Sequence, residues 1–266
     1  MKIAIVMSGM LRNFEHTFAT TKKYILDDPD FTQVDVFFAG YPGKAGMEYC
    51  EKKFVSLYNP RLYDLQAWGP KIEEEINLKT GVNDWTYNPT NSKSMNIMSF
   101  WRCRYIANEL RKKYSEQNNI DYDLVYNLRT DFFAFDTIDK TVKSNAKQDN
   151  AVYVPPDWDF KVVNPNAIGD PMAVGSSDAM DKYFSLYRFA NEYRKQGCPI
   201  HPETLLGYHF KIQNIARLFC PRNVAVEYPF SKDDVCDLWS NSWNKTEAYN
   251  AMKMDESQIK HRYELD

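Results

Sequence analysis

A short polar segment follows the first apolar run of the chain and contains the residue types of a phosphate site. Ser8 and Gly9 come directly after the apolar residues 3–7, and Arg12 follows three positions after Gly9. A glycine at a strand end lets a ligand approach the backbone, and the planar arginine fork can pair with a phosphate. The segment is neither a GxGxxG fingerprint nor a Walker loop. Its spacing also fits a tight strand-to-helix turn with a solvated arginine.

A second candidate site follows the apolar run at residues 122–128. Arg129 and Asp131 lie two positions apart at its end, and they share one face if the strand continues. A carboxylate oxygen here suits a hard divalent cation such as Mg²⁺ or Mn²⁺, which can bridge a diphosphate. The alternative is a structural ion pair between the two side chains.

Two carboxylates and a histidine in the second half of the chain are candidates for acid–base chemistry. Glu203 and His201 lie at the start of a predicted helix, where the helix dipole favours an ionised carboxylate that can act as a general base. Asp170 precedes a proline and has the chemistry to hydrogen-bond a sugar hydroxyl. The structural alternatives are a helix-capping Glu203, a loop His201 and a turn aspartate.

Composition argues against several other classes of protein. The net charge of -3 is near neutral, whereas nucleic-acid-binding domains usually carry a clear basic excess. The five cysteines are odd in number and form no CxxC pair, so we expect reduced thiols in a cytosol-like compartment. No segment is long and apolar enough for a signal peptide or a membrane span, and any work at a membrane is expected from its surface.

The elements that must position these residues alternate between strand and helix in the first third of the chain. The pattern predicts parallel crossover units and an α/β sheet whose ligands bind at the carboxyl ends of the strands. Strands are expected at residues 3–7, 34–39, 61–65, 122–128, 151–154, 170–175 and 224–226. Helices are expected at about 13–26, 46–56, 92–114, 179–194 and 201–212. Residues 69–90 have little pattern, and residues 136–150 are expected to form a loop or a short helix.

Four segments follow one another within roughly residues 1–230: SGMLRNF, YDLVYNLRTDFFAF, DPMAVGSSDAMDKYFSLY and HPETLLGYHF. Taken in this order, they resemble the WavE-type glycosyltransferases, a GT-A family of lipopolysaccharide and surface-glycan synthesis that includes members encoded by large viruses. The resemblance implies a single GT-A-like domain over residues 1–266, with a Rossmann-like, mostly parallel central sheet flanked by helices. About residues 1–130 would form the nucleotide-sugar-binding half, and about 131–266 the acceptor-binding half.

The resemblance also implies transfer of a sugar from a UDP- or GDP-sugar donor to a hydroxyl of a glycan or glycoconjugate acceptor. Ser8, Gly9 and Arg12 would contact the nucleotide. Asp131 would hold the diphosphate and a divalent cation, Mn²⁺ or Mg²⁺. This chain departs from the family at one position, because the segment that corresponds to the DxD motif of the family reads Arg129-Thr130-Asp131 here. One carboxylate makes a weaker metal site than two, and Arg129 can neutralise the diphosphate charge directly.

The predicted chemistry is an in-line attack with inversion at the anomeric carbon. Glu203 falls where many inverting members place the base, and we assign His201 to the acceptor. A second assignment makes Asp170 the base and Glu203 an acceptor contact. A retaining reaction also stays open at this stage.

Two other functions compete with glycosyl transfer. The arginine in the DxD position, together with 18 tyrosines and 6 tryptophans, fits a glycan-binding module that lost turnover. A nucleotidyltransferase is the other alternative. We expect a soluble cytoplasmic protein, in the host cytoplasm if virus-encoded, with no nucleic-acid partner. The sequence leaves its oligomeric state open.

Overall fold

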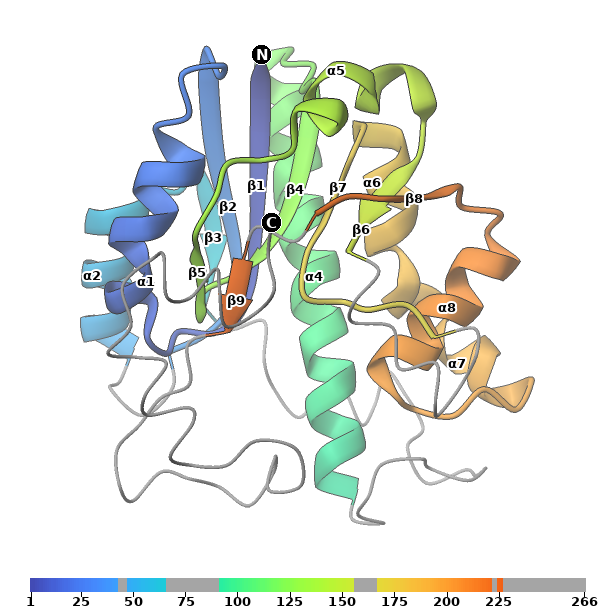
Figure 1. Cartoon of the computed structure of the whole chain (residues 1–266). Helices are drawn as coiled ribbons and strands as arrows, with labels where there is room; N and C mark the ends of the chain where they lie inside the picture. Colours follow the sequence, from blue (N-terminus) through green and yellow to red (C-terminus); the bar gives the residue numbers. More distant parts are fainter. Residues whose placement is uncertain (43–46, 66–90, 156–166, 222–223, 227–266) are drawn as a thin grey trace, which may run out of the picture.

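A seven-stranded sheet runs through the centre of the computed structural model, which describes residues 1–42, 47–65, 91–155, 167–221 and 224–226 (Figure 1). Its strands are β1 (Lys2–Met10), β2 (Gln33–Tyr41), β3 (Leu62–Asp64), β4 (Leu124–Arg129), β6 (Val152–Val154), β7 (Ala173–Gly175) and β8 (Arg217–Phe219). Their order is β3-β2-β1-β4-β7-β6-β8. The first four are parallel, and β7 runs antiparallel to both of its neighbours.

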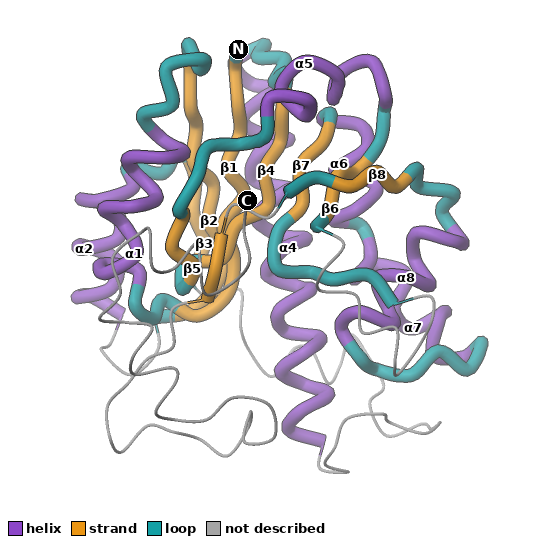
Figure 2. Tube along the Cα trace, viewed as in Figure 1, coloured by secondary structure: helices purple, strands orange, loops and turns teal. Residues whose placement is uncertain are grey.

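Helices flank this sheet, and a small second sheet lies beside it (Figure 2). The helices are α1 (Phe14–Thr21), which continues as the π-helix η1 (Lys22–Leu26), α2 (Met47–Tyr58), α4 (Asn91–Asn118), α5 (Lys140–Asp149), α6 (Ser177–Phe184), α7 (Leu186–Lys195) and α8 (Pro202–Ile212). The second sheet pairs β5 (Phe132–Ala134) with β9 (Val224–Val226) in antiparallel orientation. None of the helices described is both long and apolar enough to cross a membrane.

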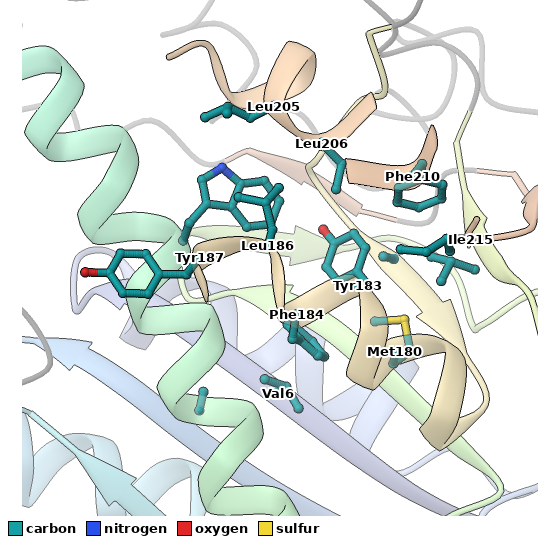
Figure 3. Packing of buried hydrophobic residues seen from close by; sticks show 14 of the residues in the cluster. Val6, Met180, Tyr183, Phe184, Leu186, Tyr187, Leu205, Leu206, Phe210 and Ile215 are labelled. Carbon is teal, nitrogen blue, oxygen red and sulfur yellow. The ribbon is translucent and has the colours of Figure 1, made fainter. Parts of the chain in front are cut away.

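The apolar run of β1 packs into two cores because successive side chains of a strand point to opposite faces. Ile3 and Ile5 face one core, which they share with Phe54 of α2. Val6 faces the other core, where α4, α6, α7 and α8 contribute buried residues such as Tyr183 (Figure 3). Burial on both faces explains why this strand is continuously apolar in the sequence.

The predicted α/β class, with a Rossmann-like and mostly parallel sheet flanked by helices, is confirmed. The helix expected at residues 179–194 is divided at Ser185 into α6 and α7, and α5 occupies most of the region where a loop or a short helix was expected. Strands β5 and β8 were not predicted. Residues 69–90 lie outside the described part of the chain.

The largest local difference from the prediction is at the ends of β1 and β2. The turn expected at Ser8-Gly9 is instead part of the paired end of β1, with Gly9 opposite Gly40 of β2. Gly9 has a φ of 106°, which side-chain-bearing residues rarely adopt. A Cβ atom on Gly40 would overlap the carbonyl oxygen of Gly9. Glycine is therefore needed here for close strand pairing rather than for a turn.

Candidate functional site

Asp131 lies between two arginines just beyond the end of β4. Arg12 places Nε 2.8 Å and Nη2 2.7 Å from Asp131 Oδ2. Arg129 donates from Nε to Oδ1 at 2.9 Å and from Nη2 to Oδ2 at 2.8 Å. The Asp131 side chain is 4% exposed, whereas those of Arg12 and Arg129 are 41% and 22% exposed. We call these three residues the arginine clamp.

The clamp joins residues more than a hundred positions apart because β1 and β4 are parallel neighbours. Ser8 pairs with Arg129, so both strands end at the same edge of the sheet. Thr130 Oγ1 donates to the carbonyl of Met10 at 2.8 Å, and Thr17 Oγ1 donates to the carbonyl of Thr130 at 2.8 Å. These two bonds tie the turn that carries Asp131 to β1 and to α1.

The electrostatics of the clamp keep Asp131 ionised. Burial alone would raise the pKa of its carboxyl, but the charges of Arg129 and Arg12 and their hydrogen bonds lower the pKa to about 2. Two guanidinium groups and one carboxylate leave the clamp itself with a net positive charge. The predicted Arg129–Asp131 ion pair is therefore present, and Arg12 joins it.

A second polar cluster surrounds Arg104 of α4, whose side chain is fully buried. Its Nη1 donates to Asp170 Oδ2 and to the Tyr183 hydroxyl, both at 3.2 Å, and its Nη2 donates to the carbonyl of Asp170 at 2.6 Å. Sequence analysis missed Arg104. The available signal was its place three residues after Trp101 on the apolar stripe of a predicted helix, because a charge there must be paired.

Glu203 and His201 lie at the start of α8, close to this second cluster. His201 Nδ1 is 3.4 Å from Glu203 Oε2 and 3.1 Å from Thr204 Oγ1. Burial first, and then the charge of Asp170, raise the pKa of Glu203 to about 8. The backbone at the helix start lowers the pKa of Glu203, in the direction expected there, but burial outweighs this effect. Burial also lowers the pKa of His201, against the opposing charge of Asp170.

Phe100 lies between the two clusters. Its ring centroid is 3.8 Å from Cζ of Arg104 and 5.5 Å from Cζ of Arg129. The charge of Arg129 also acts on the pKa of Glu203, which it lowers. The fold thus places the arginine clamp next to the carboxyl groups of Asp170 and Glu203, which come from the other half of the chain.

Ser8 lies in a buried position near the end of β1. Its side chain lies on the same face of the sheet as Asn127, and the residue is 2% exposed. Within the described residues, its hydroxyl and the side-chain amide of Asn127 have no hydrogen-bond partner. Contacts of Ser8 and Gly9 with a nucleotide stay predictions.

The clamp is a poor place for the predicted divalent cation. Four guanidinium nitrogens of Arg12 and Arg129 already lie 2.7–2.9 Å from the two oxygens of Asp131. A cation would have to displace them and then lie beside two positive charges. In the described ranges, no three His, Cys, Asp or Glu side chains come together as a metal site. These residues do not fit the Mn²⁺ or Mg²⁺ ion expected at Asp131.

Comparison with known proteins gives only distant likenesses. No protein-family model matches the chain, and no curated protein matches it significantly. Similar solved structures include mouse xyloside xylosyltransferase 1 in its apo form, with 11% identity over 82% of this chain and 85% of that one, and a TM-score of 0.45. The galactosyltransferase LgtC, in complex with donor and acceptor sugar analogues, has 11% identity over 80% and 72% of the two chains, also at 0.45.

A third likeness is to core-mannan synthase A of Aspergillus fumigatus in its Mn/GDP form. It has 11% identity over 98% of this chain and 85% of that one, with a TM-score of 0.47. The WavE-type family expected from the sequence is not confirmed by these matches. Identities and TM-scores at this level carry no function over to this chain, so its function must be inferred from its own residues.

Proposed function

We propose that the chain is a glycosyltransferase that moves a sugar from a nucleotide diphosphate sugar, a UDP- or GDP-sugar, to a hydroxyl of a glycan or glycoconjugate. The observation that carries this proposal is the arginine clamp lying across Phe100 from the buried carboxyl groups of Asp170 and Glu203. An anion site beside a base is what transfer from a diphosphate donor requires. The order of the four WavE-like segments supports the same function.

In this reaction the clamp binds the leaving group. The bond between the anomeric carbon and the diphosphate oxygen breaks, and its electron pair leaves with the diphosphate. Arg12 and Arg129 provide guanidinium N–H groups and a net positive charge, and Asp131 holds them in place before the donor arrives. Donors fixed in advance stabilise developing charge without a cost of reorganisation during the reaction.

Glu203 serves as the base in this proposal. It accepts the proton of the acceptor hydroxyl, whose oxygen forms the new bond in line with the departing diphosphate, with inversion. A pKa of about 8 makes its carboxylate a stronger base than an exposed glutamate. At neutral pH burial favours the protonated form of Glu203. His201 lies beside Glu203 and would contact the acceptor.

Asp170 has a different part because Arg104 holds it in an ion pair. In this assignment Asp170 hydrogen-bonds a sugar hydroxyl and sets the charge around Glu203. The alternative assignment, in which Asp170 is the base and Glu203 contacts the acceptor, is separated from it by a variant described in the Discussion. About residues 1–130 would serve the nucleotide sugar, and about residues 131–266 the acceptor.

A donor screen tests the function. Hydrolysis and transfer are measured for a panel of UDP- and GDP-sugars, with Mn²⁺ and with EDTA, on the wild type, Glu203→Gln and Arg61→Gln. Arg61 is a matched control, because it is 43% exposed and pairs with the buried Asp35 at the opposite end of the sheet. We expect turnover of at least one donor by the wild type and the control, and a loss of about a hundredfold or more in Glu203→Gln.

Three results would contradict the proposal. One is the absence of both turnover and any rise in melting temperature with UDP, GDP or their sugars. A second is oligosaccharide binding without donor turnover, which would identify a glycan-binding module. The third is pyrophosphate release from a nucleoside triphosphate and a sugar phosphate, which would identify a nucleotidyltransferase.

A further inference from the structure

We infer that the two guanidinium groups of the arginine clamp take the place of a metal ion at the diphosphate, and that Asp131 is their positioning residue rather than a metal ligand. This inference rests on the proposed function, because it concerns the leaving group of the same reaction. It also replaces the metal-binding role that the sequence assigned to Asp131. The ligand class is a diphosphate, either free or within a nucleotide.

The first support is the state of the Asp131 oxygens. Oδ1 accepts from Nε of Arg129, and Oδ2 accepts from Nε of Arg12 and from Nη2 of Arg129. A carboxylate has about four lone-pair sites. A fourth nitrogen, Nη2 of Arg12, also lies 2.7 Å from Oδ2. A divalent cation binds such oxygens directly, so it could enter only by displacing the arginines.

The second support is the orientation of Arg129. Its guanidinium carbon lies 4.9 Å from the ring centroid of Phe132 and 5.5 Å from that of Phe100. Contacts of this length hold a cation through the ring quadrupole. With Asp131 bound to its Nε and Nη2, the guanidinium is fixed by contacts on several sides. A site without a metal needs a cation held in this way, because a loose arginine would lose entropy when it binds.

The third support is the balance of charge. Asp131 cancels one of the two guanidinium charges, and the Arg104–Asp170 pair across Phe100 is neutral in sum. Arg12 uses Nε and Nη2 on Asp131, and 41% of its side chain is exposed. Its Nη1 lies outside this contact, and Arg guanidinium groups bind phosphate oxygens in a fork geometry. The exposed part of the clamp is therefore positive and suited to an anion.

The test is calorimetric titration of the full chain with inorganic pyrophosphate, UDP and GDP, in EDTA and again with Mn²⁺. We expect pyrophosphate and at least one nucleotide to bind in EDTA with an affinity within about threefold of that in Mn²⁺. Arg12→Gln and Arg129→Gln should each weaken binding by about tenfold or more, since each removes charge-assisted hydrogen bonds. Arg61→Gln, the matched control, should bind as the wild type does.

Two substitutions of Asp131 separate a positioning residue from a metal ligand. Asp131→Asn keeps one acceptor oxygen for the arginines, so binding in EDTA should stay within about threefold of the wild type. Asp131→Ala keeps none, and binding should fall by about tenfold. If Asp131 were a metal ligand, both variants would instead weaken diphosphate binding, and they would do so only in the presence of Mn²⁺. If either variant fails to fold, the comparison of EDTA with Mn²⁺ on the wild type still decides the question.

The outcomes also separate this inference from the proposed function. Binding of the nucleotide only with Mn²⁺, while a sugar donor is still turned over, would overturn the inference and leave the function in place. Binding in EDTA without turnover of any donor would uphold the clamp and overturn the function. No binding of pyrophosphate, UDP or GDP under either condition would overturn the inference.

Discussion

Arg104 Nη1 lies 3.2 Å from Asp170 Oδ2, in an ion pair whose guanidinium is fully buried. Because of this pair, the two neighbouring carboxyl groups, those of Asp170 and Glu203, have different environments. Arg104 pairs directly with Asp170, whereas burial and the charge of Asp170 raise the pKa of Glu203 to about 8 against the weaker opposing charge of Arg104. Carboxyl groups whose environments differ in this way usually have different chemical roles.

The pH dependence of turnover should therefore follow Glu203. If Glu203 is the base, kcat should rise about tenfold per pH unit below its pKa and level off above about pH 8, because only the ionised form accepts a proton. A pH–rate profile of the wild type with its best donor measures this. In Glu203→Gln the slope should be absent from the residual rate. A profile that is flat across this range would argue against Glu203.

Replacing Asp170 by asparagine should move that profile to lower pH. The negative charge of Asp170 raises the pKa of Glu203, so its removal lets Glu203 ionise more readily. Arg104 then lacks its anion, and breaking a buried pair of this kind costs about 3–5 kcal/mol, so the profile must be recorded below the melting temperature of Asp170→Asn. Turnover that falls by about a hundredfold at every pH would instead assign the base to Asp170.

The elements of the fold could largely be predicted from the sequence, because burial leaves a direct pattern. The run at residues 3–7 is apolar on both faces, since two cores lie against β1. The partner of Arg12 could not be predicted in the same way. Its contact with Asp131 depends on the register of β1 and β4, which brings together residues 119 positions apart.

The ionisation of Glu203 could not be predicted because two opposing effects act on it. Its place at the start of α8 is visible in the sequence, and the helix dipole there favours the charged form. Burial and Asp170 act the other way and are stronger, but both depend on tertiary packing. Arg104 illustrates the same limit, since its partner Asp170 is 66 residues away.

The stability of the chain in acid should depend on Asp131. The folded-state pKa is lowered to about 2, so its stabilising contribution is complete above the ordinary value of 3.8 and is lost as the pH falls toward 2. A shift of this size corresponds to about 2 kcal/mol. Urea unfolding from about pH 5 to about pH 2 should therefore show a steeper loss in the wild type than in Asp131→Asn. Equal slopes would mean that the ion pairs do not stabilise the fold.

The glycine at position 40 should matter for both stability and diphosphate binding. In Gly40→Ala the new Cβ would overlap the carbonyl oxygen of Gly9, so the ends of β1 and β2 must separate. We expect a loss of about 2 kcal/mol or more in the free energy of unfolding, as for other overpacked sites. The same movement displaces the carbonyl of Met10, which accepts from Thr130 next to Asp131. Pyrophosphate affinity should therefore fall by several-fold, or about 1 kcal/mol.

Gly197→Ala is the matched control for this effect. Gly197 has a φ of 90°, but a Cβ there would meet no atom within 4 Å, and the residue lies between α7 and α8 rather than at the end of β1. Its substitution should cost about 1–3 kcal/mol through backbone strain alone, and leave pyrophosphate affinity unchanged. Chemical unfolding and calorimetric titration of both variants measure the two effects separately. Wild-type affinity in a folded Gly40→Ala protein would show that the close pairing of β1 and β2 does not support the clamp.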